Sequence, residues 1–233
     1  MSNNSFKFKQ FTIFHDRCAM KVGTDGVLLG VWARVEQAKR ILDIGTGTGL
    51  IAIMMAQRAK AQIMAIDILP AVVEQAYENI SNCLWNERIE VRCEDVCNFI
   101  PENHFDTIVS NPPYFERSLL PPDDNRMHAR HTKELSFDLL IRSASRLLED
   151  KGTFQVIIPY ISVEDFTFLC WEQELYLSER MDISMKEGKL PKRSLLLFRK
   201  KEVTSLIHEH LILTHLDGTK TEKYIRLTEA YYL

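Results

Sequence analysis

The stretch that decides the fold is Asp43-Ile44-Gly45-Thr46-Gly47-Thr48-Gly49. It follows a short apolar run at residues 40–44 and precedes residues 50–59, whose apolar spacing predicts a helix. Glycines in such a turn let the backbone turn tightly and approach a ligand closely. The N-terminus of the following helix adds unpaired N–H groups and a partial positive charge. We therefore expect a strand–turn–helix unit that holds a nucleoside cofactor.

Apolar runs and turn signals alternate beyond this unit. Further strands are expected at residues 62–66, 89–93, 105–110 and 152–158, and further helices at residues 27–35, 70–82 and 137–148. Thr24 or Asp25 is expected to cap the first of these helices. The alternation of strand and helix predicts an α/β fold with a parallel sheet covered by helices on both faces.

The last third of the chain follows a different pattern. Residues 175–183, 194–200 and 208–215 have the character of consecutive strands, with a turn at residues 217–218. We therefore expect antiparallel strands at one edge of the sheet. Near the N-terminus, residues 6–14 fit either a strand or an arm. Residues 115–134 form a polar stretch, and a loop of that length is usually functional or disordered.

Composition and charge fit a globular protein of one domain. The chain has 233 residues, 45% hydrophobic and 26% charged, with a net charge of -3. This charge argues against a protein that coats nucleic acid by bulk charge, but a local basic patch stays open. Five scattered cysteines without a C-x-x-C pair indicate reduced structural thiols. With no signal-like core and no uncharged apolar run of about 18 residues, we expect a cytoplasmic protein without a membrane span.

Two carboxylates stand at the ends of expected strands. Asp67 ends the strand after the Gly-rich turn, in the position that commonly binds a ribose diol. The turn itself is G-x-G-x-G rather than the dinucleotide pattern G-x-G-x-x-G, and NAD stays an alternative ligand at this point. Glu94-Asp95 follows the third strand and has the plain alternative of a solvated loop. That strand end opens onto the same crevice, where Asp95 can accept a hydrogen bond from a cofactor adenine.

A second motif, Asn111-Pro112-Pro113-Tyr114, follows the fourth strand directly. It can be no more than a rigid turn, because proline stops strands. The residue types also suit methylation of an aromatic amine, a poor nucleophile whose lone pair is delocalised into the ring. The side-chain oxygen of Asn111 and the carbonyl of Pro112 can both accept from the amino group, orient it, and stabilise the positive charge that develops on nitrogen. Tyr114 can stack on the base.

Together, the Gly-rich turn and the Asn-Pro-Pro-Tyr motif resemble those of the class I S-adenosylmethionine-dependent amino-methyltransferases. That resemblance implies a Rossmann-like fold, with a seven-stranded sheet whose last pair forms an antiparallel hairpin. The run from Met20 to Gly30, with Asn-Pro-Pro-Tyr-Phe at residues 111–115, is similar to the bacterial tRNA1(Val) adenine-37 N(6)-methyltransferases. The likeness covers nearly the whole chain and is strongest through Tyr160.

The resemblance implies a role for each matching residue. The methionine end of S-adenosylmethionine would lie beside Lys21, residues 24–26 and the Gly-rich turn, its ribose at Asp67 and its adenine at Asp95. The full set of expected cofactor-binding residues is Lys21, Thr24, Asp25, Gly26, Asp43, Gly45, Thr46, Gly47, Gly49, Asp67, Ile68, Asp95, Val96 and Asn111. The expected catalytic residues are Asn111, Pro112, Pro113 and Tyr114, which would hold the target base.

Positive charge gathers in two places that could contact RNA. One cluster contains Arg126, His128, Arg130, His131 and Lys133, and the other contains Lys186, Lys189, Lys192 and Arg193. Such runs are usually solvated faces, yet a protein of net charge -3 that binds phosphates must concentrate its cations. The residues expected to contact RNA are Tyr114, Phe115, Arg126, Arg130, His131, Lys189, Lys192 and Arg193.

Other side chains receive plainer interpretations. His208, His210 and His215 lack the regular ligand spacing of a zinc site, so no metal is expected. Cys93 and Cys97 are interpreted as core thiols rather than a redox pair.

Several functions stay open on the sequence alone. The leading one is transfer of a methyl group from S-adenosylmethionine to N(6) of an adenine in tRNA, adenine 37 of valine tRNA on the resemblance. The same motif suits a glutamine amide in a translation factor, but such enzymes usually carry a helical domain before the turn, and only 42 residues precede Asp43. A DNA adenine methyltransferase usually needs an added recognition domain. A non-catalytic regulator would not need the Asn-Pro-Pro-Tyr motif.

We expect residues 1–233 to form one monomeric domain, with an arm and helix at 1–38, a core at 39–160 and C-terminal strands at 161–233.

Overall fold

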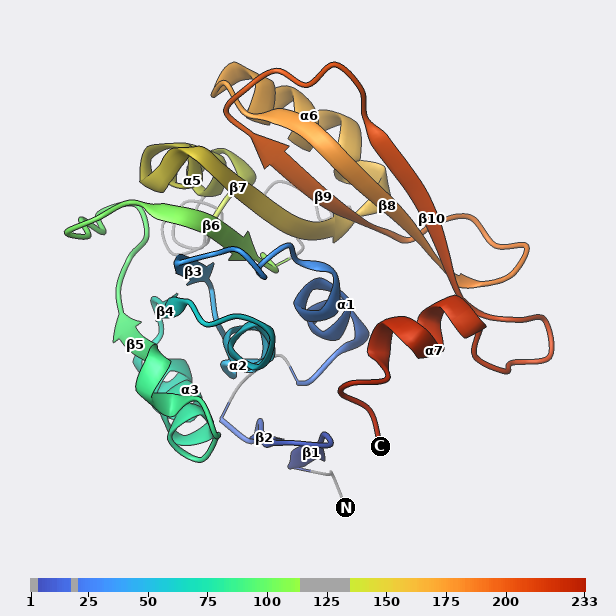
Figure 1. Cartoon of the computed structure of the whole chain (residues 1–233), viewed down its shortest axis with the longest axis horizontal. Coiled ribbons are helices and arrows are strands. Elements are labelled where there is room, and N and C mark those ends of the chain that lie inside the picture. Colours follow the sequence, from blue (N-terminus) through green and yellow to red (C-terminus); the bar gives the residue numbers. More distant parts are fainter. Residues whose placement is uncertain (1–3, 18–20, 114–134) are drawn as a thin grey trace, which may run out of the picture.

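An eight-stranded sheet with helices on both faces organises the computed structural model, which describes residues 4–17, 21–113 and 135–233 (Figure 1). The strand order is β10-β8-β9-β7-β6-β3-β4-β5. Its strands are β3 (Arg40–Ile44), β4 (Gln62–Asp67), β5 (Ile89–Cys93), β6 (Phe105–Ser110), β7 (Leu148–Pro159), β8 (Tyr176–Lys186), β9 (Arg193–Arg199) and β10 (Ile207–Thr214). The α-helices are α1 (Thr24–Trp32), α2 (Leu50–Arg58), α3 (Pro70–Ser81), α5 (Phe137–Leu147), α6 (Val163–Glu172) and α7 (Glu222–Thr228).

The parallel half of the sheet matches the sequence expectation. β3 pairs in parallel with β4 and β6, β4 pairs with β5, and β6 pairs with β7. The connections from β3 to β4, from β4 to β5 and from β6 to β7 contain α2, α3 and α5, as is usual between parallel neighbours, whereas the connection from β5 to β6 contains no helix. The inner strands β3 and β6 are buried along most of their length because helices cover both faces of the sheet, whereas the edge strand β5 alternates apolar and charged residues.

The C-terminal half has the three strands expected there, but one of them pairs differently from the expectation. β8 and β9 form the expected antiparallel hairpin, and β9 lies between β7 and β8, antiparallel to both. β10, expected at residues 208–215 as a further antiparallel strand, instead returns beside β8 and pairs with it in parallel. The sheet has eight strands among the described residues, where the family resemblance implied seven. Leu211 and Leu213 of β10 are buried in the core that includes Tyr224 of α7, which gives this strand an apolar face to bury.

Two apolar cores lie on the two faces of the sheet. One core joins α1, α2, α3 and α7 to residues such as Ile41, Val109 and Leu195, and the other joins α5 and α6 to residues such as Leu42 and Phe154. Figure 1 shows these two groups of helices on opposite sides of the sheet.

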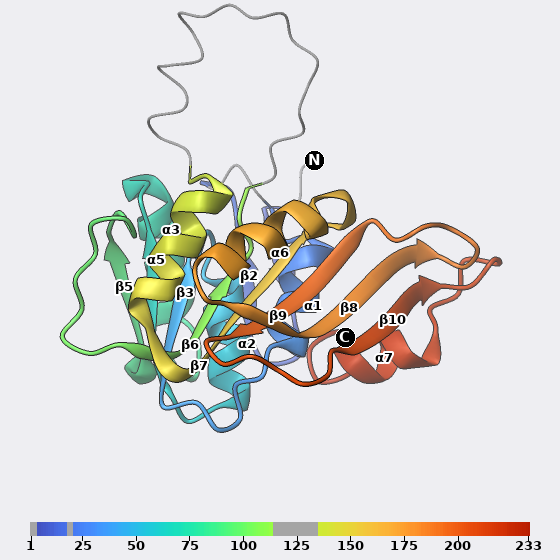
Figure 2. The ribbon, with the colours of Figure 1, turned by 90° about the horizontal axis from the view of Figure 1, so that it is seen from above.

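In the turned view of Figure 2, β8 and β10 extend to the right, away from β3 and β6. The divergence is the twist expected of a large sheet.

One open choice is resolved and two local expectations are corrected. The N-terminal stretch is a strand pair, β1 (Ser5–Lys7) with β2 (Thr12–Phe14), and so resolves the choice between strand and arm. α1 has Gly23 as its N-cap and no side-chain cap, so Thr24 and Asp25 do not cap it; the Asp25 carboxylate instead pairs with Arg193. Cys93 is exposed rather than a core thiol, because β5 is an edge strand.

Candidate active site

The carboxyl ends of four parallel strands meet in one row. The register pairs Ile44 with Ser110 across β3 and β6, and Ile44 with Ile66 across β3 and β4. Asp67 at the end of β4 lies opposite Cys93 at the end of β5. The segments that follow these strands are the Gly-rich turn, the residues after Asp67, the Glu94-Asp95 turn and Asn111-Pro112-Pro113. All four sequence motifs therefore lie at the edge where ligands bind in such sheets.

The Gly-rich turn needs its glycines for backbone conformation. Gly45, Gly47 and Gly49 have φ values of 70°, 57° and 79°, in the left-handed region that L-residues rarely adopt. A Cβ added at Gly45 or Gly47 would meet no atom within 4 Å, so the turn borders open space. A Cβ at Gly49 would lie 3.1 Å from Cδ1 of Ile80, and Gly49 therefore also permits close packing of α2 against α3.

Asp43 is a fully buried carboxylate beneath this turn. Its Oδ2 accepts a hydrogen bond of 2.7 Å from the Thr46 hydroxyl. Burial raises the pKa of Asp43 to about 7, against the opposing effect of the Thr46 hydrogen bond, and the negative charge of Asp67 adds to the rise. A hydrogen bond from the Ala52 amide, in the first turn of α2, also opposes the rise, so Asp43 joins the Gly-rich turn to the helix that follows it.

Asp67 is held by the backbone on both sides of it. Its Oδ2 accepts from the Gly47 amide and its Oδ1 from the Leu69 amide, each at 3.1 Å. These bonds fix the carboxylate between the Gly-rich turn and the start of α3, and leave further lone pairs for ligand hydroxyls. Ile68, next in the chain, is about half exposed and borders the same edge.

Asp95 lies beside Asp67 but has local partners. The Glu94 amide donates to the Asp67 carbonyl at 3.0 Å, which joins the two turns. The carboxylate of Asp95 accepts from the Cys97 amide and from Nδ2 of Asn98, each at 2.9 Å. Val96 is buried behind it. The solvated-loop interpretation is thus partly right, since Asp95 organises its own turn while each oxygen keeps a free lone pair.

The Asn-Pro-Pro segment is anchored to the Gly-rich turn through Ser110. The buried hydroxyl of Ser110 donates to the Ile44 carbonyl at 2.9 Å, so the ends of β6 and β3 are joined directly beside both motifs. Asn111 is half buried, Pro112 is buried and Pro113 is exposed. Tyr114 and Phe115 lie outside the described residues.

The first turn of α1 joins the C-terminal half of the chain to this edge. Nε of Arg193 donates to Oδ2 of Asp25 at 2.8 Å. Gly26 is buried, and a Cβ there would lie 3.2 Å from Cδ2 of Leu50, so Gly26 allows α1 to pack closely on α2. Lys21 is exposed and Thr24 is half buried.

The second basic cluster lies on the hairpin between β8 and β9, at the same edge. β9 runs antiparallel to β7, so its first residue, Arg193, pairs with Pro159 at the carboxyl end of β7. Lys189 and Lys192 are exposed, and within the described ranges neither they nor Lys186 form an ion pair with a carboxylate. Their charge is therefore available to an anionic partner. Arg126, Arg130 and His131 of the first cluster, with His128 and Lys133, lie outside the described residues.

Two buried amides that the sequence reasoning missed tie the N-terminal segment to the cofactor side. Nδ2 of Asn79 on α3 donates to the carbonyls of Phe14 and Thr48 at 2.8 and 2.9 Å, and its Oδ1 accepts from the Phe14 amide at 2.8 Å. Oε1 of Gln75 accepts from the Arg17 amide at 3.1 Å. Gln75 and Asn79 are one helical turn apart, and their only signal in the sequence is polarity on a helix face that also carries Ala76 and Ile80.

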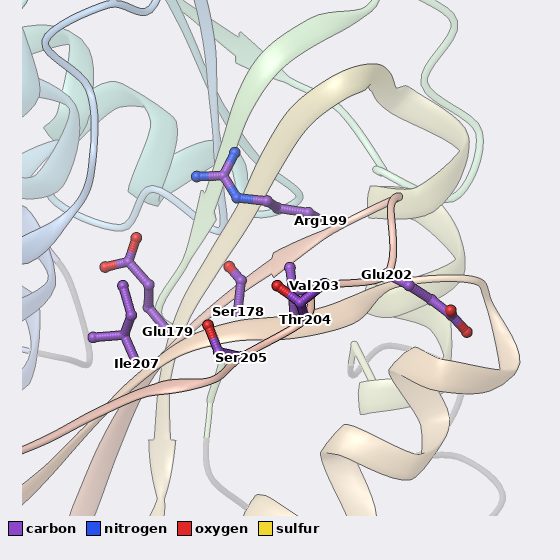
Figure 3. A pocket seen from close by; sticks show the side chains of 8 residues that line it. All are labelled: Ser178, Glu179, Arg199, Glu202, Val203, Thr204, Ser205 and Ile207. Carbon is purple, nitrogen blue, oxygen red and sulfur yellow. The ribbon is translucent and has the colours of Figure 1, made fainter.

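A cavity of about 360 Å³ lies away from these motifs, lined by residues such as Glu179, Arg199 and Ile207 (Figure 3). Arg199 ends β9 and pairs with Thr153 and Tyr176, near the starts of β7 and β8. The cavity is therefore at the opposite edge from the Gly-rich turn.

The histidines on β10 bond to β8. Nε2 of His208 lies 2.8 Å from Oδ2 of Asp182, and Nε2 of His210 lies 2.9 Å from the Ser184 hydroxyl, while His215 faces Glu187. In the part of the chain with described coordinates, no group of three or more His, Cys, Asp or Glu side chains is arranged to hold a metal ion. The same residues include no helix long and apolar enough to cross a membrane.

Comparison with known proteins agrees with this geometry. The family model for the methyltransferase small domain matches residues 22–161, from just before α1 to just after β7. The chain belongs to the methyltransferase small domain family. This methyltransferase is 52% identical to the tRNA1(Val) (adenine(37)-N6)-methyltransferase of Phocaeicola vulgatus, over 100% of this chain and 99% of that protein. It is 45% identical to the enzyme of the same name from Bacteroides thetaiotaomicron, with the same coverage.

Solved structures share the fold. A predicted O-methyltransferase from Agrobacterium tumefaciens superposes with a TM-score of 0.71 at 23% identity, over 89% of this chain and 96% of the other. A TehB-like SAM-dependent methyltransferase from Corynebacterium glutamicum gives 0.53 at 18% identity, over 77% and 89%. The Rossmann-like methyltransferase fold expected from the sequence is confirmed, with the strand count corrected.

Proposed function

We propose that this methyltransferase transfers the methyl group of S-adenosylmethionine to the N(6) amino group of adenine 37 in tRNA1(Val). The observation that carries the proposal is the row of strand ends, in which the Gly-rich turn lies between Asp67 on one side and Asn111-Pro112 on the other. This places a nucleoside-binding turn beside a pair of fixed hydrogen-bond acceptors. The name shared by relatives that match the whole chain points to the same reaction.

The residues at the edge fit the proposed cofactor. Open space borders Gly45 and Gly47, and the Asp67 carboxylate is held in place by two amides with lone pairs left for ligand hydroxyls. In the proposed arrangement Asp67 binds the ribose hydroxyls, Asp95 with Ile68 and Val96 borders the adenine, and Lys21 with residues 24–26 borders the methionine end. When bound, this cofactor supplies a methyl group already activated on a sulfonium sulfur.

The acceptors after β6 act on the target amine. In the proposed mechanism Oδ1 of Asn111 and the Pro112 carbonyl accept hydrogen bonds from the adenine amino group. They turn its nitrogen toward the methyl group, and their dipoles stabilise the positive charge that develops there. The Ser110–Ile44 bond helps to hold these acceptors beside the Gly-rich turn, and burial of Pro112 restricts the segment. Tyr114 and Phe115 are proposed to contact the base.

RNA affinity is proposed to come from cations near the same edge. Lys189, Lys192 and Arg193 lie on the β8–β9 hairpin, and Arg193 also pairs with Asp25 beside the expected cofactor site. Arg126, Arg130 and His131 are proposed to add to this set.

We further propose that residues 1–233 act as one monomeric unit, since one chain supplies every residue named here. An activity on tRNA would locate the protein in the cytoplasm.

Nucleoside mass spectrometry tests the function. Transfer RNA, ribosomal RNA and total protein are compared from cells with and without the gene. The proposal predicts loss of N(6)-methyladenosine from tRNA alone. A loss confined to ribosomal RNA, or loss of methylated glutamine from a protein, would instead point to another substrate of the same chemistry.

A further inference from the structure

Tyr160 occupies an exposed position between the catalytic strand ends and the basic hairpin. It begins a 3-10 turn, η2 (Tyr160–Ser162), directly after β7, and it is 40% exposed. Its amide donates to the Lys192 carbonyl at 3.0 Å, and Pro159 before it pairs with Arg193. From the register of Ser110 with Val156, Tyr160 lies roughly 10 Å from Asn111, given the usual spacing along and between strands. A nucleotide close to one held at Asn111 can reach this ring.

A guanidinium group backs the ring. Cζ of Arg180 on β8 lies over Tyr160, 5.3 Å from the ring centroid. Nε of Arg180 donates to Oδ1 of Asp182 at 2.8 Å, and Asp182 is buried. The same carboxylate accepts from the Ser194 hydroxyl at 2.5 Å and lies 2.8 Å from Nε2 of His208.

This network fixes the cation against the ring. Burial acts to raise the pKa of Asp182, but the hydrogen bonds from Arg180, Ser194 and His208 outweigh it, and the pKa lies below its ordinary value. Asp182 is therefore ionised at neutral pH and holds Arg180 by charge as well as by hydrogen bonds. A ring backed in this way loses little conformational freedom when it stacks on a partner.

We propose that Tyr160, backed by Arg180, is a stacking platform for an unpaired nucleobase adjacent to the target adenine. The inference rests on the proposed function and adds a second base-binding site to it. Aromatic rings stack on any base, and arginine contributes to such sites through cation–π interactions. Ile161, 88% exposed, extends the apolar surface beside the ring.

The charges nearby favour a base over a phosphate. Glu164 and Asp165 follow in the first turn of α6, and their carboxylates repel a phosphate. A neutral base meets no such penalty. Phosphates are better served by Lys189 and Lys192 on the hairpin, which carry no carboxylate partner in the described chain. The platform therefore contacts a base, and the hairpin lysines contact the phosphates of the RNA backbone.

The test pairs variants of Tyr160 with abasic RNA. Tyr160→Ala, Tyr160→Phe and the control Tyr77→Ala, an exposed tyrosine on α3, are compared on an anticodon stem-loop of tRNA1(Val). The loop is intact or carries one abasic nucleotide at a position flanking the target. Single-turnover methylation at saturating cofactor is measured as a function of RNA concentration. Calorimetric titration of S-adenosylmethionine checks that each variant keeps its cofactor site.

The inference predicts that Tyr160→Ala weakens the apparent RNA affinity by about 5- to 100-fold, with a much smaller change in the rate at saturating RNA. Tyr160→Phe and Tyr77→Ala stay near wild type. An abasic nucleotide at one flanking position weakens the RNA affinity of the wild type by a similar factor. On that RNA, Tyr160→Ala causes no further loss, because the base that stacks on the ring is absent. Normal affinity for Tyr160→Ala, or an equal loss on every abasic RNA, would overturn the platform. Absence of methylation by the wild type on the intact loop would instead reject the proposed function.

Discussion

The two halves of the sheet present different groups at the same edge. In the half made of β6, β3, β4 and β5, all strands are parallel, and the turns after β3, β4 and β5 are held there by backbone amides. In the other half, β9 runs against β7 and β8, so a hairpin tip with exposed lysines reaches this edge. Short amide-lined turns suit a small polar cofactor, whereas an exposed cationic hairpin suits an extended anion. The comparison separates cofactor binding from RNA binding by sheet topology.

Asn111→Ala is expected to have the largest effect. The parallel half should then still bind cofactor, but the target amine loses an acceptor that gains strength as positive charge develops. We expect the single-turnover rate to fall by at least about 100- to 1,000-fold. Affinity for S-adenosylmethionine should change little, because the Gly-rich turn and Asp67 are intact. A near-normal rate at saturating cofactor and RNA would remove Asn111 from the mechanism.

Asp67→Ala tests the cofactor side of the comparison. Loss of two charge-assisted hydrogen bonds to the ribose should weaken S-adenosylmethionine binding by roughly 1.5–3 kcal/mol. Asp217→Ala, which removes a carboxylate from an exposed turn, is the matched control. Calorimetric titration measures both variants. Unchanged affinity, or a preference of the wild type for NAD, contradicts the assignment of this turn.

Asp43 makes the stability of the parallel half depend on pH. Its pKa rises on folding from 3.8 to about 7, so the folded state favours the protonated carboxyl. The stability that Asp43 gains from this shift is therefore fully present below pH 3.8 and is lost as the pH rises from there through about 7. Over this range the free energy of unfolding falls by up to about 1.4 kcal/mol per pH unit. Asp43→Asn keeps an acceptor for Thr46 and should flatten this part of the profile. Urea denaturation of both proteins without cofactor, between pH 4 and 8, measures the free energy of unfolding at each pH. The same pH dependence in wild type and Asp43→Asn would contradict this role of Asp43.

Neutralising the hairpin should have the smallest effect and act on RNA alone. In Lys189→Gln/Lys192→Gln, the dependence of log affinity on log salt should flatten by about 0.7–0.9 per lost phosphate contact. Lys39→Gln/Lys60→Gln removes two exposed lysines that precede β3 and β4 at the opposite edge. This control should keep the wild-type slope. The same salt dependence of RNA affinity in all three proteins would mean that the hairpin lysines do not contact RNA.

The two halves also differ in how well the sequence predicts them. The Gly-rich turn, Asp67 and Asn111 follow strands whose apolar runs are local signals, and one rule about parallel strands predicts that they meet. The place of β10 beside β8 depends on a pairing between distant segments, which no local pattern encodes. The bonds from Asn79 to Phe14 and Thr48 depend likewise on the docking of distant segments.

Methyl transfer to a defined transcript tests the central claim most directly. Purified protein is incubated with S-adenosylmethionine labelled in its methyl group and with tRNA1(Val) that carries either adenine or guanine at position 37. Asn111→Ala serves as the inactive control. The account predicts transfer of one methyl group per adenine-37 transcript, recovered as N(6)-methyladenosine, and none to the guanine-37 transcript. Equal labelling of both transcripts, or labelling of neither, would contradict it.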